Sequence, residues 1–318
     1  MRSAVVATAF GGPDALSTVK EPIPEPGRGE VTIQVRAAGV NPFDGLLYSG
    51  AFGDDESLLP MRLGQEFAGV VTATGPDATG PAGPVQVGDE VLVYSPGPLG
   101  AYATDVTCPA DIVVPKPAAL AWEKAAGLLF AGAAAVHALT SVAVSDGDTL
   151  LLHGAAGGVG SVATQLAILR GAQVIGVDRE SRHEALRAQG ALPVSYGPDF
   201  TSRVRELAPG GITAAIDAVG SDEAIDLSLE LVPDRKRIAT LVNFPRGNEA
   251  GINTLGAAGG AIDAGTEVRA NAWTELVPKA TDGSLDIVVS RTFPLAETAQ
   301  AHKLMAAGQA DGKIVLLP

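Results

Sequence analysis

The sequence feature best suited to chemistry is a glycine-rich turn that lies between a short apolar run and a helical pattern. Thr149–His153 is apolar, Gly154–Gly160 reads GAAGGVG, and Ser161–Arg170 has the apolar spacing of a helix. Glycines let the backbone turn tightly and approach an anion, and the first N–H groups of a helix attract negative charge. This order predicts a site for the pyrophosphate of a dinucleotide, and the alternative is an ordinary tight turn.

The next apolar run ends in residues that could select the cofactor. Val174–Val177 leads into Asp178 and Arg179, and Arg182 and His183 follow closely. A carboxylate at this place usually binds the ribose 2′-hydroxyl of NAD, whereas guanidinium groups suit the 2′-phosphate of NADP. The carboxylate thus favours NAD and the basic residues favour NADP. Alternatively, these residues form only a solvated turn that binds no cofactor.

Bulk composition argues against several classes of function. The 318 residues carry a formal net charge of −14, which is scattered and disfavours binding to nucleic acid or to an anionic membrane. No apolar run has the ~18–20 residues of a membrane-spanning helix, and the N-terminus lacks the features of a signal peptide, so we expect a cytoplasmic protein. Cys108 is the only cysteine, which excludes an internal disulfide; its neighbours predict a small buried side chain rather than a nucleophile.

Three regions of the chain differ in pattern. Residues 1–118 contain short runs rich in Val, Ile and Thr between Gly and Pro, which is typical of a mostly β unit. Residues 119–284 alternate helical and strand patterns, which is typical of βαβ units on a parallel sheet. In this second region we expect helices at Trp122–Val144 and Ser161–Arg170 and strands at Thr149–His153, Gln173–Val177, Ile212–Asp217 and Arg237–Val242. Residues 285–318 end the chain with a strand, a helix and a closing strand.

With these patterns in place, the sequence resembles the medium-chain dehydrogenase/reductase superfamily, in its zinc-independent quinone oxidoreductase branch, over nearly the whole chain. The motifs that carry the resemblance are Asn41–Asp44 (NPFD), Gly64–Gly69 (GQEFAG), Gly147–Gln165 and Gly312–Leu316. The resemblance implies an α/β fold. A Rossmann domain with a doubly wound parallel sheet, residues 119–284, is inserted in a mostly β GroES-like catalytic domain, residues 1–118 and 285–318.

The resemblance also implies a reaction without zinc. Zinc-dependent relatives carry Cys or Asp at the first catalytic ligand position and His just before the Glu of the second motif. Here the segment Asn41–Asp44 contains no cysteine, and Gln65 takes the place of the histidine. Glutamine is a poor zinc ligand, so oxidation of an alcohol through a zinc alkoxide is not expected.

The same resemblance suggests the site residues. Asn41 and Asp44 would face the nicotinamide, and Tyr48 could donate a proton or a hydrogen bond to an acceptor oxygen. A simple turn at Asn41 is the alternative. Tyr196 matches a family tyrosine near the 2′-phosphate, which favours NADPH, with NADH possible. The expected cofactor-binding residues are Ala156, Gly157, Gly158, Val159, Gly160, Asp178, Arg179, Arg182, His183, Tyr196, Val219, Leu241 and Asn243.

The function implied is transfer of a hydride from NADPH to a small quinone or an α,β-unsaturated carbonyl compound, by a homodimer. We expect no catalytic triad, because the four histidines lie in regions without a matching Ser and Asp pattern. An enoyl-thioester reductase is one alternative. A non-catalytic dinucleotide-binding protein is another, favoured by Ala134, where the family often has a threonine.

Overall fold

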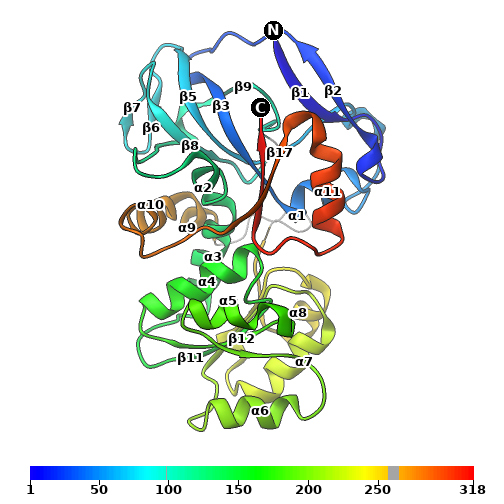
Figure 1. Ribbon diagram of the computed structural model, residues 1–318, viewed down its shortest axis with the longest axis vertical. Coiled ribbons are helices and arrows are strands. Elements are labelled where there is room, and N and C mark those ends of the chain that lie inside the picture. The colour runs from blue at the N-terminus through cyan, green and yellow to red at the C-terminus, as the bar shows by residue number, and fades with distance from the viewer. Residues whose placement is uncertain (98, 257–264) are drawn as a thin grey trace. The chain divides into compact units, whose positions relative to one another are not determined.

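The computed structural model describes residues 1–97, 99–256 and 265–318, which form two units, each built around a main sheet (Figure 1). The first unit combines Met1–Phe130 with Leu276–Pro318, and the second is Ala131–Glu275. The chain therefore leaves the first unit once and returns to it. In the described part of the chain, no helix has the length and apolar character needed to cross a membrane.

The first unit is built around a sheet with the strand order β10-β8-β5-β3-β18-β17, in which β9 also pairs with β3. Neighbouring strands are antiparallel except β17 and β18, which are parallel. Because β18 pairs with β3, the last strand of the chain completes a sheet that the N-terminal residues begin. The strands are β3 (Glu30–Val40), β5 (Glu66–Thr74), β8 (Glu90–Tyr94), β9 (Asp105–Pro109), β10 (Val113–Pro115), β17 (Val289–Pro294) and β18 (Lys313–Leu317).

Alternating burial along these strands forms the core of the first unit. Val31, Ile33 and Val35 of β3 point inward and pack with Phe67 of β5. The free Cys108 of β9 lies in the same cluster, where burial raises the pKa of its thiol to about 12. A thiol with such a pKa is protonated at neutral pH, which confirms the expectation of a small buried side chain.

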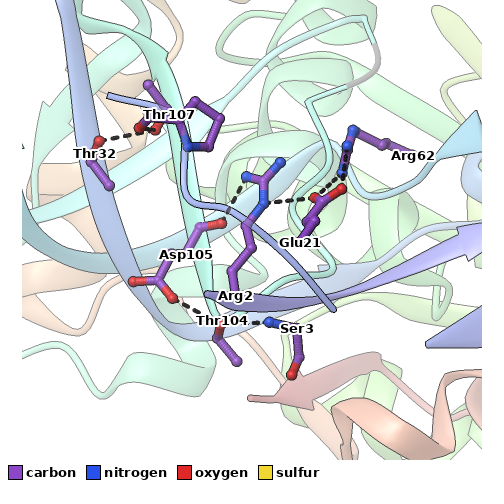
Figure 2. Close-up of polar contacts among 9 residues, drawn as sticks. Arg2, Ser3, Glu21, Thr32, Arg62, Thr104, Asp105 and Thr107 are labelled. Carbon is purple, nitrogen blue, oxygen red and sulfur yellow. Dashed lines mark hydrogen bonds and ion pairs between the residues drawn. The ribbon is translucent and has the colours of Figure 1, made fainter. Parts of the chain in front are cut away.

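A smaller sheet at the N-terminus, in the order β2-β1-β4, is attached to the main sheet by charged side chains. Its strands are β1 (Arg2–Ala7), β2 (Leu16–Glu21) and β4 (Met61–Arg62). Figure 2 shows the Arg2 guanidinium between the Glu21 side chain and Asp105 of β9. Arg2 Nε lies 2.7 Å from Glu21 Oε1, and its Nη1 donates to the Asp105 carbonyl at 3.0 Å. Arg62 pairs with the same Glu21 carboxylate, so one acid joins all three strands of this sheet.

The second unit contains a fully parallel sheet in the order β13-β12-β11-β14-β15-β16. Numbered within this unit, the order is 3-2-1-4-5-6, which places the reversal of strand order between β11 and β14; ligands of such sheets bind at the carboxyl ends of these strands. The strands are β11 (Thr149–His153), β12 (Gln173–Val177), β13 (Leu192–Val194), β14 (Ala214–Asp217), β15 (Ile238–Thr240) and β16 (Asn253–Thr254). Flanking helices are α4 (Gly158–Leu169), α5 (His183–Ala188), α6 (Phe200–Leu207), α7 (Asp222–Leu231) and α8 (Phe244–Ala250). The unit also contains α9 (Thr266–Asn271).

The expectation of one helix over Trp122–Val144 is wrong. The segment forms α2 (Trp122–Ala126) and α3 (Leu129–Ser141), which are separated at Gly127. A Cβ at residue 127 would lie 3.2 Å from the side chain of Lys313. The apolar spacing alone does not show this break, because the neighbour that requires it comes from the other end of the chain.

Candidate functional site

The glycine-rich turn of the second unit joins the end of β11 to the start of α4. Gly154 has a φ of +76°, a backbone conformation that favours glycine. A Cβ at residue 160 would lie 2.0 Å from the Gly154 carbonyl oxygen, so only glycine allows the turn to approach the helix this closely. Gly157 is the N-cap of α4. Because glycine has no side chain, it does not cap the first N–H groups of this helix. The first N–H groups of the helix thus suit the phosphate oxygens of a dinucleotide.

The end of β12 brings the predicted selectivity residues to this turn. Asp178 Oδ2 accepts a hydrogen bond from the Ala156 backbone N–H at 3.0 Å, and Oδ1 accepts one from the Arg179 N–H at 2.9 Å. Arg182 Nη1 lies 3.8 Å from Asp178 Oδ1. The Asp178 carboxylate is thus held by the turn and offset by a guanidinium group, which reduces its repulsion of a nearby phosphate.

His183 joins the same group through a residue that the sequence analysis missed. Its Nε2 lies 3.0 Å from Ser195 Oγ and 3.2 Å from the Asp178 carbonyl oxygen. Ser195 follows β13, and Arg203 of α6 donates to the Ser195 carbonyl at 2.9 Å. Its position next to Tyr196 could have indicated that Ser195 belongs to this group. The strand order places the end of β13 beside the end of β12.

The Tyr196 hydroxyl is bonded inside the second unit. Ser228 Oγ donates to the Ala224 carbonyl at 2.7 Å, so Ser228 accepts from His153 Nε2 at 3.1 Å. His153 Nδ1 then accepts from the Tyr196 hydroxyl at 2.7 Å. Burial lowers the pKa of His153 to about 3, which keeps the imidazole neutral. The predicted contact of Tyr196 with the 2′-phosphate therefore competes with a hydrogen bond that this structure already contains.

Three further predicted residues lie at the carboxyl ends of β14 and β15. The buried Asp217 carboxylate accepts from the Val219 N–H at 2.8 Å, and the Asp217 carbonyl accepts from the Leu241 N–H at 2.9 Å. Asn243 is the N-cap of α8, and its Nδ2 donates to the Gly220 carbonyl at 3.1 Å. The structure brings Val219, Leu241 and Asn243 together at the edge where a cofactor of such a sheet binds.

In the first unit, Asn41 is the N-cap of α1 (Pro42–Tyr48). It therefore also has the local backbone role that was the alternative to a role in the site. The buried Asn41 side chain has two charged partners. Its Oδ1 accepts from Lys313 Nζ at 2.5 Å, and its Nδ2 donates to Glu66 Oε1 at 3.1 Å. Lys313 and Glu66 form an ion pair at 2.7 Å. Neither partner was predicted from the sequence as a site residue. The available signal was a lysine that opens an apolar strand, because a buried ammonium needs a counter-charge.

Asp44 connects this site to the core of the first unit. Its Oδ2 accepts from the Asn41 N–H at 2.9 Å and from the Tyr102 hydroxyl at 2.8 Å. Burial raises the pKa of Asp44 to about 6, although the hydrogen bond from Tyr102 opposes this shift. Among the described residues, Asp44 Oδ1 is buried without a hydrogen-bond partner. The carboxylate therefore fixes the first turn of α1.

Tyr48 lies in the same core. Its hydroxyl is 2.9 Å from His302 Nδ1 of α11 (Thr298–Ala306), and His302 Nε2 is 3.3 Å from the Tyr102 hydroxyl. Burial raises the pKa of Tyr48 to about 12 and lowers that of His302 to about 4. The predicted residues Asn41, Asp44 and Tyr48 thus belong to one hydrogen-bonded network, and all three are buried, with exposed fractions of 1%, 0% and 2%.

The residues in the places of zinc ligands do not suit zinc. Asn41 Oδ1 is bonded to the Lys313 ammonium, whose positive charge would repel a metal ion. Gln65 turns its Nε2 to the Pro96 carbonyl at 2.8 Å. Over the described ranges, no group of three or more His, Cys, Asp or Glu side chains is arranged to hold a metal ion. Asn41 and Gln65 therefore do not fit a catalytic zinc ion.

The chain matches known proteins along its whole length. Residues 27–118 match the model of the alcohol dehydrogenase GroES-like domain, and residues 190–316 match that of a zinc-binding dehydrogenase. A quinone oxidoreductase of Pseudomonas aeruginosa is 32% identical, with all of both chains covered. The chain belongs to the medium-chain dehydrogenase/reductase superfamily, in its quinone oxidoreductase branch.

Two other members of this superfamily extend the comparison. A 2-haloacrylate reductase of a Burkholderia species is 32% identical over all of this chain and 99% of the relative. A mycobacterial protein solved in complex with NADPH is 33% identical, with a TM-score of 0.83 and all of both chains covered. The predicted family and its fold class, a Rossmann sheet inserted in a GroES-like domain, are confirmed. The expected domain boundaries at residues 118 and 285 stay a prediction.

Proposed function

We propose that this protein reduces a small quinone or an α,β-unsaturated carbonyl compound with NADPH. The observation that carries the proposal is the match, over both full chains, to a quinone oxidoreductase. The related 2-haloacrylate reductase and the NADPH-bound mycobacterial structure support the same class of reaction and the same cofactor. When bound, the reduced nicotinamide supplies the hydride, and the protein supplies orientation and a suitable electrostatic environment.

We propose that the second unit holds the dinucleotide. The N–H groups of Gly157–Gly160 would bind the pyrophosphate, as the tight approach at Gly160 suggests. The side chains of Arg179, Arg182 and His183 would bind the 2′-phosphate, and Asp178 would orient them. Val219, Leu241 and Asn243 would line the remaining part of the site.

In the first unit, we propose that Asn41 contacts the acceptor. Asp44 and Tyr48 then act as positioning residues, because they fix α1, which begins directly after Asn41. The oxygen that gains negative charge during reduction can take its proton from water, so no side chain has to serve as the acid. We also propose a cytoplasmic homodimer, supported by β16, which is an edge strand of its sheet among the described residues.

The proposal is tested by following the oxidation of NADPH and NADH with a panel of acceptors. The panel contains quinones, enones, an enoyl thioester and simple aldehydes, and the protein is treated with a chelator. We expect turnover of quinones or enones with NADPH, and little turnover of aldehydes. If the enoyl thioester is turned over fastest, the protein is instead an enoyl-thioester reductase. Tight cofactor binding without any turnover would contradict the proposal and favour a non-catalytic dinucleotide-binding protein.

Cofactor preference gives a second prediction. Replacement of Arg182 by alanine should lower kcat/KM for NADPH by about 10- to 100-fold, because a charge-assisted hydrogen bond to a phosphate contributes about 1.5–3 kcal/mol. The value for NADH should stay within about threefold. Arg246→Ala is the matched control, since Arg246 pairs with Asp226 on a different helix of the same unit. Equal losses with both cofactors would show that Arg182 does not contact the 2′-phosphate.

A further inference from the structure

The Asn41 amide is held in one orientation by two opposite charges. The Lys313 ammonium donates to its oxygen at 2.5 Å, and its nitrogen donates to the Glu66 carboxylate at 3.1 Å. The flipped amide would place its NH₂ group against the ammonium and its oxygen against the carboxylate. Both contacts would then be repulsive, so the charges select a single orientation.

The backbone of the first unit is shaped around this pair of charges. A Cβ at residue 39 would lie 2.5 Å from Glu66 Oε1, and a Cβ at residue 127 would lie 3.2 Å from the Lys313 side chain. Glu66 Oε2 also accepts from the Phe130 N–H at 2.9 Å. Glu66 and Lys313 are only 1% and 6% exposed. The glycines at residues 39 and 127 thus leave room for the two charged side chains. Because both side chains are buried, water does not separate them from Asn41.

This arrangement leaves one strong donor. An amide nitrogen carries two hydrogens, and Asn41 uses one of them for Glu66. Within the described part of the chain, the second hydrogen of Asn41 Nδ2 has no acceptor. A cation on the amide oxygen draws electron density away from the nitrogen, and hydrogen bonds coupled in this way strengthen each other. The remaining N–H of Asn41 therefore suits an oxygen that becomes negatively charged.

We propose that Lys313 is a positioning residue for the reduction, which orients and polarises the Asn41 amide as the donor to the carbonyl oxygen of the acceptor. This inference rests on the proposed function. The hydride brings two electrons to the acceptor, the electron pair of its π bond moves to the oxygen, and water supplies the proton that completes the product. Lys313 itself transfers no proton and acts through Asn41.

The test compares Lys313→Met with the double variant Lys313→Met/Glu66→Gln. The single variant leaves the Glu66 carboxylate buried without its partner, so it loses stability as well as polarisation. The double variant has no unpaired buried charge, so its melting temperature should recover towards that of the wild type. Its rate of NADPH oxidation in a single turnover with a saturating quinone should nevertheless stay about 100-fold below the wild type. This loss approaches the effect of removing the donor itself, because the Asn41 amide is no longer held in the donating orientation.

Two controls separate polarisation from packing. Lys313→Arg keeps the positive charge and should retain a rate within about tenfold of the wild type, and the Kd for NADPH should change less than twofold in all variants. Recovery of both stability and rate in the double variant would show that the ion pair serves only folding, and this would overturn the inference.

A spectroscopic measurement keeps the inference separate from the proposed function. The probe is cyclohex-2-enone with a ¹³C-labelled carbonyl, bound in the presence of NADP⁺ so that no reduction occurs. We expect a lower carbonyl stretching frequency in the wild type than in the double variant, because the polarised amide weakens the C=O bond. Equal frequencies would overturn the role of Lys313. A wild type that lowers the frequency but reduces no acceptor would contradict the proposed function alone.

Discussion

Replacement of Gly160 by alanine should nearly abolish binding of the dinucleotide. The added Cβ would lie 2.0 Å from the Gly154 carbonyl oxygen and 2.8 Å from the Ala155 Cα, and both are backbone atoms that cannot rotate away. The turn must move, which displaces the N–H groups that would hold the pyrophosphate. We expect the Kd for NADPH to rise at least about 100-fold and the free energy of unfolding to fall by about 1–3 kcal/mol, the usual effect of overpacking.

The matched control for this variant is Gly210→Ala. Gly210 lies in the same unit, and a Cβ there would meet no atom within 4 Å. Titration of cofactor fluorescence measures the Kd, and urea denaturation measures the free energy of unfolding. If Gly160→Ala binds NADPH like the control, the turn between β11 and α4 does not hold the pyrophosphate, and the proposed location of the cofactor is wrong.

Moderate acid should destabilise the protein through two buried histidines. Burial lowers the pKa of His153 to about 3 and that of His302 to about 4, whereas both rings take up protons near pH 6.5 in the unfolded chain. Their contribution to stability is therefore complete above pH 6.5 and is lost as the pH falls below it. Between pH 7 and pH 5, each histidine should lower the free energy of unfolding by about 2 kcal/mol, since one pKa unit corresponds to about 1.4 kcal/mol.

Asp44 opposes part of this loss. Burial raises its pKa to about 6 from the ordinary 3.8, so its charged form weakens the folded state above pH 6 and this penalty is relieved as the pH falls. The relief by pH 5 is about 1 kcal/mol, which leaves a net loss of about 3 kcal/mol. Urea denaturation at both pH values measures it. In His302→Gln the net loss should shrink to about 1 kcal/mol, and an unchanged loss would show that His302 does not carry the effect.

Much of the fold is visible in local pattern. The strands at Thr149–His153 and Gln173–Val177 have the bounds that the sequence predicts, and the turn after Thr149–His153 leads into a helix as expected. Apolar runs of this kind are buried on both faces of a parallel sheet, so the pattern is continuous and its ends are marked by turn residues. The strands β13 and β16 were not predicted, because they are only two or three residues long and β13 contains Pro193.

The candidate site was predictable only in part. The glycine turn and the group around Asp178 are local in the sequence, and each was proposed from its neighbours. Glu66 and Lys313 are 247 residues apart, and the short sequence segments around them do not show that they form an ion pair. That contact depends on strand order, which places β18 next to β3 and β3 next to β5.

The sequence by itself determined the type of most of the longer elements, the glycine turn and the family, because these depend on residue types at short spacing. Tertiary structure alone decided how the polar groups are used. It turned the hydroxyl of Tyr196 to His153 and that of Tyr48 to His302, and it placed Lys313 on Asn41. The physical reason is that a buried polar group must find a partner, and the partner available depends on which distant segments the fold brings together.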